Sequence, residues 1–82
     1  MSNEYLKLAI KHAQAGDWDL AHKIVQVRDD SIACWIHAVL HKIEGDESNS
    51  RYWYASSKNQ YEDFTDSGEE LNAISQQLER ND

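Results

Sequence analysis

The chain has 82 residues and one cysteine, so its size suits a single small domain and its composition excludes an internal disulfide and a cysteine-based zinc site. Its net charge is −7, and residues 44–82 hold ten acidic residues against three basic ones, which argues against binding to nucleic acid or to an anionic membrane. The first residues lack a signal-peptide pattern and the longest apolar stretch, Ile32–Leu40, is too short to span a membrane, so we expect a soluble cytoplasmic protein.

Two helices are predicted in the first part of the chain, one on each side of a Gly-Asp step. Apolar residues at helical spacing predict the first helix over Asn3–Ala15. Gly16 suits the left-handed residue that ends a helix, and Asp17 is expected to cap the next one. The second helix is predicted over Trp18–Arg28, so the first hairpin covers residues 2–28.

The third helix is predicted over Ile32–Glu44, and apolar residues occupy nearly all of its sides. A helix of this kind is buried all round, so we expect it at the centre of the fold. Gly45 and Asp46 then repeat the Gly-Asp step 29 residues after the first one (45 − 16 = 29). A fourth helix over Glu47–Ser57 completes a second hairpin, over residues 31–57.

The C-terminal part is predicted to be a polar linker, residues 58–66, followed by a fifth helix. Ser67 and Glu70 have the spacing of a capping box, which opens this helix over residues 67–80. The helix has an apolar stripe of Leu71, Ile74 and Leu78. No segment alternates between apolar and polar residues, so the sequence predicts an all-α fold in a single domain, 1–82.

The second hairpin contains the segments Ala33–Ala38, Glu44–Asp46 and Tyr52–Ala55, in which small and aromatic residues flank the Gly-Asp step. With the recurrence of that step, this pattern resembles the tetratricopeptide and Sel1-like class of helical repeats, and it is similar to a group of short bacterial proteins. The resemblance implies two antiparallel helix hairpins and a C-terminal capping helix. Because the repeat is shorter than the usual ~34 residues and two hairpins are fewer than the usual three, a compact bundle is the alternative to an open solenoid.

In that class, the first helix of each hairpin lines a concave surface that binds peptides. Transferred by position, this surface, hereafter the groove, holds Leu6, Ile10, Trp35, Ile36, Val39 and Ile43. Apolar patches of this size are rarely left exposed on monomers. The fifth helix, a second copy of the chain or a different protein is therefore expected to fill the groove.

His37 and His41 are four residues apart in the third predicted helix, a spacing that places two imidazoles on one side of a metal ion. His12 or His22, from other helices, could add a ligand. Ala38 stands where the metalloprotease pattern has glutamate, so that pattern is absent. Because His12 and His41 occupy equivalent repeat positions, the sequence favours a packing role for them over metal binding.

Tyr52 and Trp53 belong to three consecutive aromatic residues that cannot all face the core, which makes them candidates for surface anchors. No catalytic motif is present, so we expect neither an enzyme nor a cofactor. The leading hypothesis is a small module that binds another protein, or itself as a homodimer. The alternative is a helical protein that binds a metal ion or a small molecule through His37 and His41.

Overall fold

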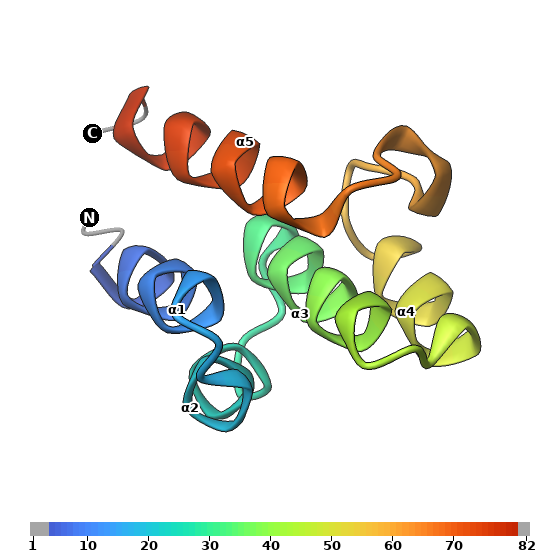
Figure 1. Ribbon diagram of the computed structural model, residues 1–82, viewed down its shortest axis with the longest axis horizontal. Coiled ribbons are helices and arrows are strands. Elements are labelled where there is room, and N and C mark those ends of the chain that lie inside the picture. The colour runs from blue at the N-terminus through green and yellow to red at the C-terminus, as the bar shows by residue number, and fades with distance from the viewer. Residues whose placement is uncertain (1–3, 81–82) are drawn as a thin grey trace.

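The computed structural model describes residues 4–80, and every regular element within them is helical (Figure 1). The elements are α1 (Glu4–Gln14), α2 (Trp18–Val25), α3 (Ser31–Ile43), α4 (Glu47–Tyr54), a 3-10 turn η1 (Tyr61–Asp63) and α5 (Ser67–Arg80). The all-α prediction is confirmed. The predicted start of the first helix at Asn3, and of its hairpin at residue 2, lies outside the described residues. None of the helices between residues 4 and 80 has both the length and the apolar composition that a membrane crossing requires.

The two Gly-Asp steps make the same turn. Gly16 and Gly45 have φ angles of +84° and +86°, in the region where a side chain is unfavourable. At the first turn the amides of Gly16 and Asp17 bond back three and five residues, and the amides of Gly45 and Asp46 do the same at the second. This is the Schellman pattern that ends a helix.

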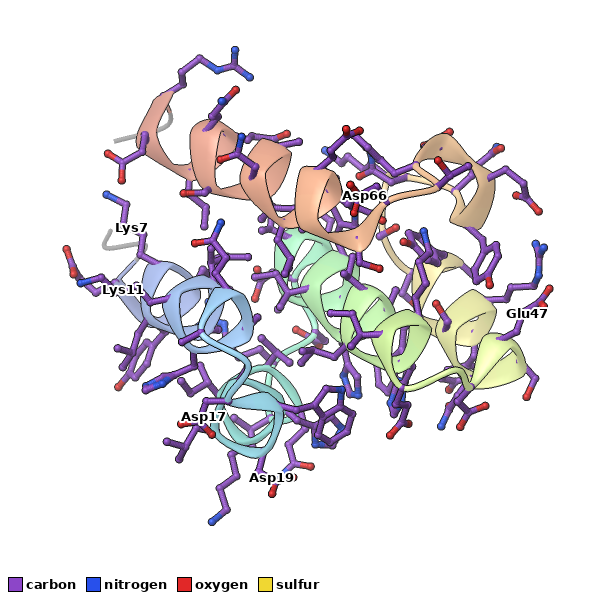
Figure 2. The ribbon with its side chains drawn as sticks, viewed as in Figure 1. Lys7, Lys11, Asp17, Asp19, Glu47 and Asp66 are labelled. Atoms are coloured by element: carbon purple, nitrogen blue, oxygen red, sulfur yellow. The ribbon has the colours of Figure 1, made fainter. Side chains whose placement is uncertain are left out.

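The two aspartates that follow these glycines behave differently. Asp46 accepts a hydrogen bond from the Asn49 amide at 3.3 Å and caps α4. Asp17 precedes α2 but makes no side-chain capping bond, so the predicted role of its carboxylate is wrong. Its carboxylate lies 3.6 Å from His12 Nδ1 instead, and Figure 2 shows Asp17 at the start of α2.

The third helix is the centre of the fold, as predicted. Every residue from Ala33 to His41 is buried, and α3 packs against α1, α2, α4 and α5. The helices α1 and α2 pack as one pair and α3 and α4 as another (Figure 1). A single apolar cluster draws side chains from all five helices of residues 4–80.

Helix α5 covers the groove by packing across α1 and α3. Its apolar stripe is buried in the same cluster as five of the six groove residues: Leu6, Ile10, Trp35, Ile36 and Val39. Ile43, the sixth, is 45% exposed because it lies at the last turn of α3. The groove is therefore not an open surface, since the chain itself supplies the apolar helix that fills it.

The predicted capping box at the start of α5 does not form. Asp66, rather than Ser67, caps the helix by accepting a hydrogen bond from the Gly68 amide at 2.9 Å. Glu70 points into the core and is fully buried. The reason is that buried donors from distant helices compete for its carboxylate.

The hydrogen bonds that Glu70 accepts hold α5 to the rest of the molecule. Glu70 accepts hydrogen bonds from Trp35 Nε1 at 2.8 Å, from the Tyr54 hydroxyl at 2.6 Å and from Lys42 Nζ at 2.9 Å. Lys42 also donates to the carbonyl oxygens of Tyr61 and Phe64 in the linker. A buried ion pair, in which both carboxylate oxygens of Glu70 accept hydrogen bonds, thus connects α3, α4, the linker and α5.

Candidate metal centre

Three histidines from two helices meet on the side of α3 that faces α2. His22 comes from α2, and His37 and His41 come from α3. One ring nitrogen from each lies within 4.8 Å of the other two. We call this group the histidine cluster. The structure thus brings the pair singled out in the sequence together with a third imidazole, while His12 lies elsewhere, beside Asp17.

Local sequence spacing explains why these rings meet. His37 and His41 are one helical turn apart, so they project from the same side of α3. Trp18 and His22 have the same spacing on α2. Trp18 Nε1 donates a hydrogen bond to the Leu40 carbonyl at 2.7 Å, which fixes the position of α2 beside the second half of α3. His22 is therefore held next to the pair.

Two tryptophans enclose the histidine cluster. Trp18 stacks on His22, with ring centroids 4.7 Å apart, and Trp53 of α4 stacks on His37 at 3.9 Å. His22 meets His37 edge to face at 4.7 Å, and His37 and His41 are stacked at 5.0 Å. The indoles limit the rotation of two of the imidazoles and shield them from water.

The buried side chain of His37 has a polar atom that lacks a hydrogen-bond partner within residues 4–80, which is the clearest indication that this site takes a ligand. Its Nδ1 atom is buried and has no hydrogen-bond partner among the described residues. Buried polar groups are almost always hydrogen-bonded in native proteins. Burial, together with the nearby His22 and His41, lowers the pKa of His37 to about 4, so the ring is neutral at neutral pH. Neutral imidazole is the form that binds metal ions.

His41 has a carboxylate partner. Its Nδ1 atom lies 2.7 Å from Glu44 Oε2, one turn further along the chain. A histidine that binds a metal through one nitrogen usually donates a hydrogen bond from the other, often to a carboxylate. Asp46 is also close, because His41, Glu44 and Asp46 offer ligand atoms within 4.8 Å of one another.

The spacing of the histidine cluster is compatible with a bound metal ion. Imidazole nitrogens bind zinc at about 2.0–2.1 Å, which places two tetrahedral ligands about 3.4 Å apart. The three nitrogens lie within 4.8 Å of one another, so they would need to approach by at most about 1.4 Å. This approach would have to come mainly from His41, because the stacked indoles limit the rotation of His22 and His37.

The aromatic anchor candidates differ from each other. Tyr52 is 66% exposed, whereas Trp53 is half-buried against His37.

Sequence reasoning did not identify Trp18, Trp53 or Glu44 as parts of the histidine site. The matching spacing of Trp18 and His22 with His37 and His41 was a usable signal, and so was an acid one turn after His41.

Comparison of the chain with protein-family models, with curated proteins and with solved structures gave no match. The resemblance to the tetratricopeptide and Sel1-like repeats therefore stays a prediction. The geometry of the histidine cluster is the feature of the molecule that points to a function.

Proposed function

We propose that this protein binds a late first-row transition-metal ion through His22, His37 and His41. The observation that carries the proposal is the convergence of three imidazoles, with ligand nitrogens within 4.8 Å of one another. The buried Nδ1 of His37, which has no partner within residues 4–80, supports it independently. This is the alternative hypothesis from the sequence, with His22 rather than His12 as the further histidine.

The donor set favours a particular class of ion. Three neutral nitrogens suit Zn²⁺, Ni²⁺ and Cu²⁺, whereas Mg²⁺ and Ca²⁺ require oxygen ligands. Protein sites with three ligands commonly leave a fourth position for water or another small ligand. We therefore expect binding of one late transition-metal ion per chain and no response to Mg²⁺.

The test is calorimetric titration of the full chain with Zn²⁺, Ni²⁺ and Cu²⁺. His37→Ala should abolish high-affinity binding because it removes the most buried ligand. His12→Ala is the matched control, since His12 lies outside the histidine cluster, and it should bind as the wild type does. The proposal fails if the wild type binds none of the three ions, or if His37→Ala binds them equally well.

Tryptophan fluorescence gives a second measurement. Trp18 and Trp53 stack directly on two of the proposed ligands. Bound Cu²⁺ should therefore quench their emission, and the quenching should saturate at one ion per chain. In Trp18→Phe and Trp53→Phe the quenched fraction should fall, because Trp35 lies on the other side of α3 against Glu70.

A second candidate function, binding of a protein partner, is favoured by an exposed surface formed by α1, α2 and the connector that follows α2. Val27 is 79% exposed and Tyr5 is 64% exposed, and both line a hollow together with Ile24, Lys23 and Arg28. Since the groove is filled by α5, this surface is the better site for the interaction that the sequence suggests. We propose that it pairs with a second copy of the chain.

Sedimentation velocity tests this second candidate. The wild type should form a dimer whose population rises with concentration, and Val27→Glu should remain monomeric because it places a charge in the contact. Tyr52→Ala, which alters an exposed aromatic residue on α4, is the control and should leave the dimer intact. A wild type that is monomeric at all concentrations would contradict the candidate.

A further inference from the structure

Glu44 occupies a position that the turn after α3 fixes. It is the C-cap residue of α3, and its backbone amide donates to the Leu40 carbonyl at 3.2 Å. Gly45, with its positive φ, follows directly and ends the helix. The carboxylate of Glu44 is therefore attached to a defined point of the backbone, one turn beyond His41.

The contact between His41 and Glu44 determines where the imidazole holds its proton. A carboxylate accepts hydrogen bonds and cannot donate one, so the Nδ1 atom 2.7 Å away must carry the hydrogen. A neutral imidazole has a single N–H group, so its Nε2 atom keeps a free lone pair. Only Nε2 of His41 is then available to a metal ion.

Other groups around His41 do not compete for Nδ1. Asp46 is the other carboxylate nearby, and its oxygens accept from the Asn49 amide and the Asn49 side chain. Trp18 faces His41 edge to face, with ring centroids 5.8 Å apart, and its Nε1 is committed to the Leu40 carbonyl. Within residues 4–80, the side-chain hydrogen bond of the His41 ring is therefore the one with Glu44.

We infer that Glu44 is a positioning residue for the proposed metal site, an inference that rests on that proposed function. It holds His41 in the Nδ1–H tautomer before any metal arrives and so directs the Nε2 lone pair to the ion. Loss of a carboxylate in this role typically weakens metal binding 10- to 100-fold. Glu44→Ala should therefore weaken binding by about that factor while leaving one site per chain.

The tautomer can be measured in the metal-free protein by nitrogen NMR of the imidazole rings, at a pH where His41 is neutral. The wild type should show the hydrogen of His41 on Nδ1. In Glu44→Ala the hydrogen should move partly or wholly to Nε2, because the acceptor is gone. Glu44→Gln keeps an acceptor oxygen, so it should retain more of the Nδ1–H form and more of the metal affinity than Glu44→Ala.

Glu47→Ala is the matched control, because Glu47 is an exposed acid nearby that pairs with Arg51. It should change neither the tautomer of His41 nor the affinity for Zn²⁺. The inference is overturned if wild-type His41 carries its hydrogen on Nε2, or if Glu44→Ala binds Zn²⁺ as tightly as the wild type. A wild type that binds no metal but shows the Nδ1–H tautomer would refute the proposed function alone, since the assignment of Glu44 as the group that sets the tautomer would stand.

Discussion

Glu70 shows how one residue can join distant parts of a small protein. Its side chain is fully buried, and it takes hydrogen bonds from a lysine, a tryptophan and a tyrosine on two helices. Burial raises the pKa of Tyr54 and the hydrogen bond to Glu70 raises it further, so the hydroxyl remains a donor. A buried charge of this kind is tolerated only while all of its partners are present.

Replacing Glu70 with alanine should therefore destabilise the protein strongly. The ammonium group of Lys42 would be left buried without its counter-ion, a change that costs about 3–5 kcal/mol in comparable cases. Urea unfolding measures the loss. Glu70→Gln should lose less, because its amide oxygen still accepts a hydrogen bond. Glu69→Ala is the control and should stay within about 1 kcal/mol of the wild type; equal losses at residues 69 and 70 would contradict the argument.

His37 should make the stability of the metal-free protein depend on pH. Its pKa is about 4 in the folded protein, against an ordinary value of 6.5, because burial disfavours the charged ring. Between these two values the unfolded chain binds the proton and the folded chain does not. Stability should therefore fall as pH decreases from 6.5 towards 4, by at most about 1.4 kcal/mol per pH unit from this group.

The measurement is urea unfolding at several pH values in this window, for the wild type and for His37→Gln. The variant should be less stable at neutral pH, because it loses the stacking on Trp53, and its stability should fall less steeply with acid. His12→Gln is the control and should keep the wild-type slope. Equal slopes in the wild type and in His37→Gln would show that His37 is not held neutral.

At the scale of the elements, the two Gly-Asp turns set the ends of α1 and α3. A Cβ atom added at Gly45 would meet no atom within 4 Å, so the cost of a side chain there comes from the backbone alone. Gly45→Ala should destabilise the protein by about 1–2 kcal/mol, the cost of a left-handed conformation for alanine. Gly68→Ala is the control, because Gly68 lies in the first turn of α5 without a positive φ. Thermal unfolding should show no loss there, and a similar loss at both sites would contradict the explanation.

The helices and the central place of α3 could be predicted because they depend on local spacing and on the apolar character of one segment. The helix ends were less accurate. The fourth helix was expected to reach Ser57 but ends at Tyr54, where the Ser57 hydroxyl bonds to the Tyr54 carbonyl and competes with the helical pattern. The capping box failed for a non-local reason, since Glu70 bonds to Trp35, 35 residues away.

The histidine cluster could be predicted only in part. His37 and His41 share a helix, so their spacing alone indicates that they lie together. The choice of His22 over His12 depends on how α2 packs against α3, and the contact that decides it joins Trp18 to Leu40, 22 residues apart. No pattern of neighbouring residues contains that information. The stacking of Trp53 on His37 requires the position of a third helix and was not foreseeable either.

At the scale of the whole molecule, the histidine cluster joins the two helix pairs. His22 belongs to the pair α1 and α2, while His37 and His41 belong to the pair α3 and α4. An ion bound by all three would connect the pairs in the folded state, and the unfolded chain would not hold the ligands together. Metal binding and folding should therefore be coupled.

Thermal unfolding followed by circular dichroism tests this coupling. A free Zn²⁺ concentration 100 times the dissociation constant should add about 2.7 kcal/mol of stability, provided that the unfolded chain does not bind the ion. For a domain of this size such a change raises the melting temperature by about 10 °C or more, and a chelator should reverse it. His22→Ala should lose most of the increase, because the two remaining ligands share one helix and cannot connect the pairs. His12→Ala should keep it. An increase that survives in His22→Ala would mean that the ion binds without joining α2 to α3, and the three-histidine site would then be wrong.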